Sequence, residues 1–180
     1  MKTACVLLPS ALVMTVSASG QVTQPGFGDK GCPSASVLSQ TASISPEDYI
    51  EIQRTKCFTN CPLYEVRLYG DGRLVWHGNR AVKSMGDATA TIEAGQAQAL
   101  INKALKSGFG GLCDEYVMRG FDGTFSTTLL RVGGEIKTVA DDAPSNAPVW
   151  LRRLGIEVEA LDAVQNLIGP KQNPRIPNER

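Results

Sequence analysis

Two cysteines that lie close together are the residues with the clearest capacity for chemistry. Cys57 and Cys61 are separated by three residues, and Pro62 follows them. If this stretch forms a turn, the two Cα atoms can approach the distance of about 4.4–6.8 Å that a disulfide needs. We therefore predict a structural disulfide here. A redox-active dithiol is an alternative, although its usual spacing is C-x-x-C and no thioredoxin-like βαβ pattern surrounds the pair.

Two further cysteines could form a second disulfide or contribute to a metal site. Cys32 and Cys113 are the remaining partners if the first pair forms, and the sequence alone leaves their bridge open. Zinc normally takes four Cys or His ligands in closely spaced pairs, so a zinc site would have to recruit these two cysteines and His77 without a second paired motif. We predict no metal and no cofactor.

Histidine chemistry is restricted because His77 is the single histidine of the chain. Every Ser-His-Asp arrangement would need it as the base. A hydrolase that uses His77 with a carboxylate is therefore one hypothesis, but the sequence contains no G-x-S-x-G, H-E-x-x-H or Walker motif. We expect a non-catalytic domain, and we treat enzymatic activity as the less favoured interpretation.

Aromatic side chains offer candidate binding surfaces. Tyr64, Tyr69 and Trp76 lie on neighbouring expected strands, so some of them could form a recognition patch if the sheet has an open face. Core packing against helices is the more common use of such residues. A second hypothesis is a protein-binding or enzyme-inhibitor module that presents Phe58 and Asn60 on the turn between the paired cysteines.

The N-terminus predicts export. Residues 1–20 contain Lys2, then a mostly apolar run over residues 4–16, then small residues around Ser17, the three parts of a secretory signal peptide. The run of 13 residues is shorter than the roughly 20 that span a bilayer. We expect a periplasmic or extracellular protein without a transmembrane segment in its mature chain. Cleavage would also remove Cys5, which leaves an even number of cysteines, as disulfide pairing requires.

Composition narrows the classes of partner. The 180 residues carry 18 Lys plus Arg and 18 Asp plus Glu, and 42% of them are hydrophobic. A balanced charge gives no footprint for nucleic acid, and the apolar content is typical of a globular domain. The partner is unknown from the sequence, and another exported protein is the class we favour.

The elements that must position these residues follow from hydrophobic periodicity. Residues 21–45 are rich in Gly, Pro, Ser and Thr, which predicts a flexible linker. We expect residues 46–168 to form one domain and residues 169–180 to form a disordered tail. Within the domain we expect strands at 49–54, 63–69 and 73–77, a helix at 94–106, a hairpin at 124–139 and a helix at 150–168. This order predicts a two-layer α+β fold with two helices packed on one face of an antiparallel sheet.

One combination of motifs resembles a known family. The stretch from Cys57 to Tyr64 reads C-F-T-N-C-P-L-Y, and a Y-G-D-G turn follows at residues 69–72. This is similar to a domain-of-unknown-function family of bacterial exported proteins, and the resemblance covers about residues 48–168. The chain departs from it in having Asn60 where a small residue is usual and in carrying Cys113. The resemblance implies export, the α+β fold and the paired cysteines, and it implies no reaction.

Overall fold

A seven-stranded sheet forms one layer of the protein. The computed structural model describes residues 32, 38–56, 61–117, 125–142 and 145–170. The strands are β1 (Tyr49–Lys56), β2 (Leu63–Tyr69), β3 (Arg73–Arg80), β4 (Gly86–Thr91), β5 (Glu115–Tyr116), β6 (Phe125–Val132) and β7 (Glu135–Asp142). Their order is β4-β3-β2-β1-β6-β7-β5, and every neighbouring pair is antiparallel except β5 and β7.

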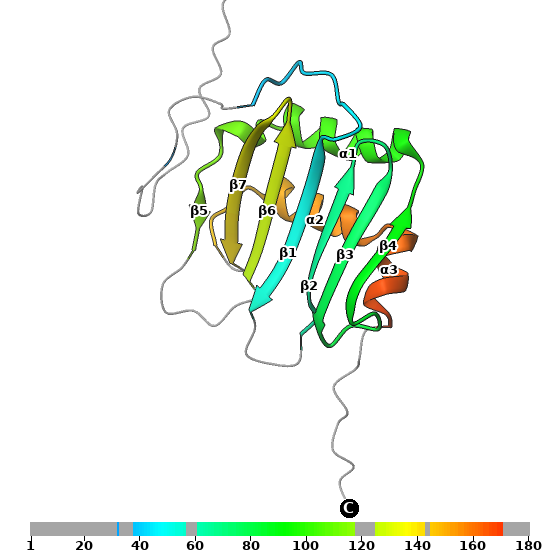
Figure 1. The fold of residues 1–180 in the computed structure, drawn as a ribbon. Coiled ribbons are helices and arrows are strands. Elements are labelled where there is room, and N and C mark those ends of the chain that lie inside the picture. Colours follow the sequence, from blue (N-terminus) through cyan, green and yellow to red (C-terminus); the bar gives the residue numbers. More distant parts are fainter. Residues whose placement is uncertain (1–31, 33–37, 57–60, 118–124, 143–144, 171–180) are drawn as a thin grey trace, which may run out of the picture.

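Helices form the second layer and lie behind one face of the sheet (Figure 1). They are α1 (Ala94–Lys106), α2 (Val149–Glu159) and α3 (Asp162–Ile168), and a short 3-10 turn, η1 (Phe109–Gly111), follows α1. The predicted α+β class is therefore confirmed. The number of helices differs, because the segment expected as one helix at residues 150–168 is divided into α2 and α3.

Alternation along the strands builds the core on the helix side. In β2, Tyr64, Val66 and Leu68 are buried while the residues between them are less so. On the helices, the predicted apolar stripe of α1 is buried, which brings Ile101 and Leu105 against the sheet. Burial of such side chains is worth about 1.5–3 kcal/mol each, so this shared core holds the two layers together.

None of the described helices covers the other face of the sheet (Figure 1). Tyr69, which alternates with the buried residues of β2, is half-buried there, and Arg73 on β3 is exposed. Antiparallel sheets commonly pack one face and solvate the other, which explains the alternating sequence of β2 and β3. The open face is thus a surface that the fold leaves partly exposed to solvent over several strands.

Tight turns at glycines set the hairpins. Gly72, in the Asp-Gly turn between β2 and β3, has φ +88°, and Gly133 and Gly134 between β6 and β7 have φ +62° and +88°. These left-handed conformations favour glycine because it has no Cβ. Both hairpin turns that the sequence predicts are therefore confirmed.

The segment before β1 is tied to the folded body. Leu38 is 3% exposed and belongs to the core cluster, although the sequence assigned it to the linker at residues 21–45. Asp48 is 1% exposed. Its carboxylate accepts hydrogen bonds from the backbone N–H groups of Ser45 (2.7 Å) and Gly133 (2.9 Å). One buried side chain thus joins the entry to β1 with the turn between β6 and β7.

The described helices are all too short or too polar to cross a bilayer. The signal peptide expected at residues 1–20 and the tail from residue 171 onward lie outside the described residues.

Candidate functional site

The cysteines form at least one bridge within the described residues. Cys32 and Cys113 are joined by a disulfide across 81 positions of sequence. Cys61 is also disulfide-bonded. Cys57, together with Phe58 and Asn60, lies outside the described residues, so the predicted Cys57–Cys61 pairing and the binding turn stay predictions.

The three aromatic residues singled out from the sequence lie on opposite faces of the sheet. Tyr64 and Trp76 face the helices, are 2% and 0% exposed, and stack with ring centroids 4.7 Å apart. The Trp76 indole N–H also donates to the backbone oxygen of Ser84 at 2.8 Å. These two residues are therefore core residues and not part of a recognition patch. Tyr69 alone lies on the open face, because it is an odd number of positions from Tyr64.

A polar cluster holds the strand ends on either side of the cysteine turn. The Tyr64 hydroxyl donates to Glu159 Oε1 at 2.6 Å, and Arg54 Nε donates to the same oxygen at 2.7 Å. Burial, with Glu159 beside it, raises the pKa of Tyr64, which therefore stays a neutral donor. Since Arg54 lies near the end of β1 and Tyr64 near the start of β2, Glu159 of α2 fixes both strands where the turn begins and ends.

An arginine–tyrosine row crosses the open face. The Arg67 guanidinium lies 4.6 Å from the centroid of the Tyr49 ring, and that of Arg73 lies 4.2 Å from the centroid of Tyr69. The two tyrosine rings are themselves 5.3 Å apart and tilted by 56°. Cation–π contacts of this kind fix the guanidinium planes against the rings. The row brings together residues of β1, β2 and β3 that are distant in sequence.

A buried carboxylate supports this row. Glu51 of β1 lies on the open face yet is only 3% exposed. It accepts hydrogen bonds from Arg67 Nε at 2.5 Å and from Gln53 Nε2 at 2.6 Å. Burial lowers the pKa of Arg67, but hydrogen bonds to Tyr69 and Glu51 outweigh that effect and raise it. Arg67 is therefore a permanently charged group whose side chain is still 38% exposed.

The histidine has carboxylate neighbours on the same face. His77 Nδ1 lies 2.6 Å from Asp87 Oδ1, and Glu65 is its cross-strand partner on β2. The hydrogen bond with Asp87 raises the pKa of His77. Asp87, Asn79 and Glu65, the groups that act on the histidine, carry no nucleophilic hydroxyl or thiol. The arrangement thus places an imidazole and carboxylates together, groups that can exchange a proton.

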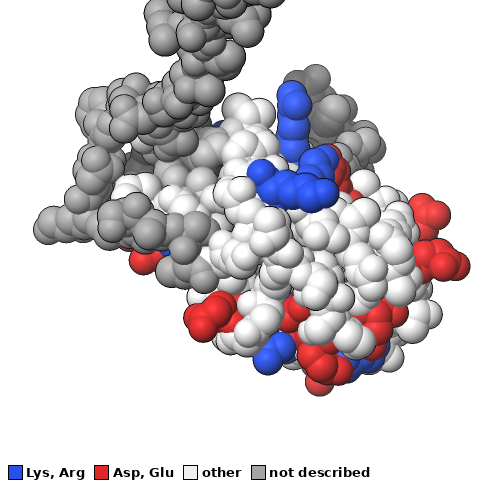
Figure 2. All heavy atoms as spheres, turned by 90° about the horizontal axis from the view of Figure 1, so that it is seen from above, with Lys and Arg blue, Asp and Glu red and all other residues white. Residues whose placement is uncertain are grey.

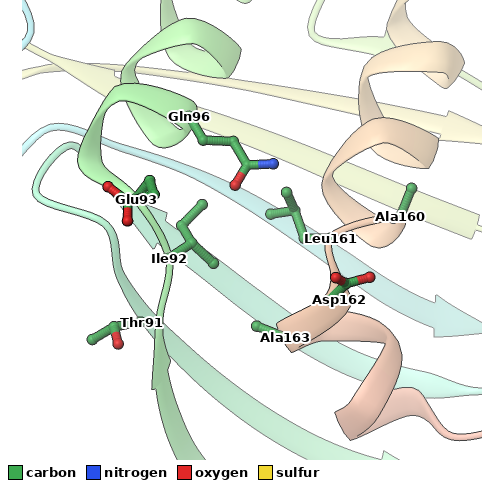
Figure 3. Close-up of a pocket in the computed structure, with 8 residues that line it drawn as sticks. All are labelled: Thr91, Ile92, Glu93, Gln96, Ala160, Leu161, Asp162 and Ala163. Carbon is green, nitrogen blue, oxygen red and sulfur yellow. The ribbon is translucent and has the colours of Figure 1, made fainter.

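A groove of about 510 Å³ opens where β4 passes into α1 and α2 passes into α3. Figure 3 shows the side chains that line it, with those of Gln96 and Leu161 directed toward one another. The lining residues are Thr91, Ile92, Glu93, Gln96, Ala160, Leu161, Asp162 and Ala163. Its apolar groups come from both helix junctions, and its two charged groups are both acidic.

Charged groups are dispersed over the described surface. Seen from above, the described surface carries both acidic and basic side chains among mostly uncharged ones, and neither sign covers it (Figure 2). Within the described ranges, no group of three or more His, Cys, Asp or Glu side chains is placed to hold a metal ion.

One comparison with known proteins found a match. Residues 48–162 match the model of a family described as a domain of unknown function, DUF6438. The match begins one residue before β1 and ends at the first residue of α3, so it includes the whole sheet, α1 and α2. No curated protein matches the chain.

Proposed function

The chain belongs to the DUF6438 family, whose function is unknown, and we propose that it is an exported domain that acts by binding a partner protein and not by catalysis. The contact surface in this proposal is the open face of the sheet. Its centre is the arginine–tyrosine row described above, which consists of Arg73, Tyr69, Tyr49 and Arg67. We call it the open-face row from here on.

The observation that carries the proposal is the pre-organisation of the open-face row. Glu51 fixes Arg67 at 2.5 Å, and Arg67 and Arg73 stack on Tyr49 and Tyr69. Arginine and tyrosine are the residues most enriched among those that dominate binding energy. Side chains already held in one conformation lose less entropy when a partner binds.

Two features support export. Residues 1–20 have the composition of a signal peptide. Disulfides such as Cys32–Cys113 persist in oxidising compartments and are rare in the cytosol. The exported protein should therefore lack residues 1–20, and its intact mass would give both the cleavage site and the number of disulfides.

Partner capture from the source organism's envelope and secreted fractions tests the proposed surface. Immobilised wild-type protein is compared with Tyr69→Ala and Arg73→Ala, and Arg153→Ala, an exposed arginine of α2, is the matched control. We expect a partner that is recovered by the wild type and the control and is reduced at least fivefold by either row variant. Equal recovery by all four proteins would exclude the open face as the contact surface.

The cysteine turn remains the second candidate surface. Glu159 holds Arg54 and Tyr64 on the two strands that flank the turn, which favours a fixed loop. In this alternative, Phe58→Ala and Asn60→Ala would reduce capture and the row variants would not. A thiol-redox role for Cys57 and Cys61 requires a dithiol potential in the range of redox proteins, and a value below about −300 mV would mark a structural bridge.

A further inference from the structure

The sheet ends on one side in a strand with an open edge. β4 is the terminal strand of the sheet order and pairs with β3 alone among the described strands. It reads Gly-Asp-Ala-Thr-Ala-Thr and contains no lysine and no proline, and its pairing with β3 runs without a bulge from Arg73–Thr91 to Gly78–Gly86. Natural edge strands usually carry such devices to prevent further pairing. Every second residue of β4 therefore presents outward N–H and C=O groups that can pair with another strand.

The groove lies directly beside this edge. Thr91 is the last residue of β4, and the next residues along the chain, Ile92 and Glu93, form one wall of the groove. Leu161 and Ala163 form the opposite wall at the α2–α3 junction, on the helix side of the sheet (Figure 3). Successive side chains of a strand point to opposite faces. A strand added to β4 would therefore direct every second side chain toward the helix layer, where the groove lies.

The charges of this region favour a basic side chain. Glu93 and Asp162 line the groove from the starts of α1 and α3, and no lysine or arginine lines it. Glu93 makes no side-chain capping hydrogen bond, so its carboxylate is not used by its own helix in that way. Asp87, at the other end of β4, pairs with His77 on the open face and does not belong to this region. Ile92 and Leu161 between the acids provide apolar contact for an aliphatic stem.

We propose that β4 and the adjoining groove bind an extended segment of a partner polypeptide, which pairs with β4 as an eighth strand and inserts a lysine or arginine side chain between Glu93 and Asp162. Backbone hydrogen bonds to a sheet edge supply affinity in this mode, and a pocket for an alternate side chain supplies specificity. Arg73 of the open-face row is the cross-strand partner of Thr91, but the groove opens between β4 and the helices, and the proposal goes beyond the function proposed above.

Peptide binding to the oxidised, full-length mature chain tests the proposal. The probe is the acetylated, amidated hexapeptide Thr-Val-Lys-Val-Thr-Val, and the controls have norleucine or glutamate in place of the lysine. We expect the norleucine peptide to bind about three- to tenfold more weakly, the size of two exposed ion pairs, and the glutamate peptide more weakly still. In the complex, alternate backbone amides of β4 should gain protection from hydrogen exchange, which a merely electrostatic contact would not cause.

Variants of the chain separate the groove from general charge effects. Glu93→Gln with Asp162→Asn should remove the preference for lysine over norleucine, whereas Glu135→Gln, an exposed carboxylate on β7, should keep it. Tyr69→Ala should leave peptide binding unchanged, so this test and that of the open-face row can fail independently. The proposal is overturned if none of the peptides protects the β4 amides, if lysine and glutamate peptides bind equally, or if the chain dimerises through β4 and no peptide competes.

Discussion

Glu51 and Arg67 lie directly opposite each other on β1 and β2, and a hydrogen bond of 2.5 Å joins the Arg67 Nε to the Glu51 carboxylate. The pair lies on the face of the sheet that no helix covers, yet Glu51 is 3% exposed. On that face, the Arg67 and Gln53 side chains donate hydrogen bonds to its carboxylate. Such a pair fixes the side chains around it more than it adds to overall stability.

Glu51→Gln should destabilise the protein. The amide keeps the size of the side chain but leaves Arg67 without its nearest countercharge, and it also replaces the charge-assisted bond by a weaker one. We expect the free energy of unfolding to fall by about 1–3 kcal/mol, measured by denaturant titration. Glu135→Gln, at an exposed position, is the control and should change it by less than about 0.5 kcal/mol. Equal effects of the two variants would show that Glu51 has no special role.

The disulfide between Cys32 and Cys113 should contribute more stability than the predicted short one. It closes a loop across 81 positions of sequence, for which the chain-entropy model gives about 4.5 kcal/mol, whereas a five-residue loop gives about 2 kcal/mol. Replacing both Cys32 and Cys113 by serine should therefore lower the melting temperature more than replacing both Cys57 and Cys61. The reverse order would indicate that the segment around Cys32 adds little to the fold.

Gly155→Ala should stabilise α2. A glycine at this position of the sequence is compatible with a helix that it weakens or with a break, and α2 continues through it. A Cβ there would meet Arg54 at an ordinary contact distance of 3.6 Å. Alanine is favoured over glycine in a helix interior by about 0.8–1 kcal/mol, so we expect a gain of that order in the free energy of unfolding. Gly108→Ala is the contrasting variant, because Gly108 has φ +85° and should lose about 1 kcal/mol or more. A loss of stability in Gly155→Ala would show that the contact with Arg54 is tighter than its distance implies.

Local patterns in the sequence predict most of the strands and helices but not how they pair and pack. The helix expected at residues 94–106 is α1 with the same bounds, because its apolar stripe has the helical period. The β5 strand was not predicted, since its two residues show no periodicity and it pairs with β7 in parallel. The division between α2 and α3 falls at Leu161, whose extended backbone turns its side chain into the core. That break depends on tertiary packing, and the hydrophobic periodicity of the sequence does not predict it.

The open-face row was missed for a related reason. Alternation already placed Arg67 and Tyr69 on one face of their strand, and it placed Tyr49 and Glu51 on one face of theirs. The register that brings Glu51 opposite Arg67 and Tyr49 opposite Tyr69 was not available, because it depends on how the chain crosses between β1 and β2. A search for arginine and tyrosine at matching positions of adjacent expected strands would have found the row.

His77 should titrate above its ordinary value, and Asp87 should be the main cause. The hydrogen bond with Asp87 raises the pKa of His77 from 6.5. A raised pKa means that protonation of His77 favours the folded state. This contribution to the stability of the fold is fully present below about pH 6.5, and it disappears as the pH rises through the pKa that His77 has in the folded protein. Because the chain has one histidine, its imidazole signals in an NMR titration need no assignment. Asp87→Asn should lower the measured pKa toward 6.5, and Asp71→Asn, an acid that pairs with Arg73, should leave it unchanged. A wild-type pKa at or below 6.5 would show that the Asp87 contact is absent in solution.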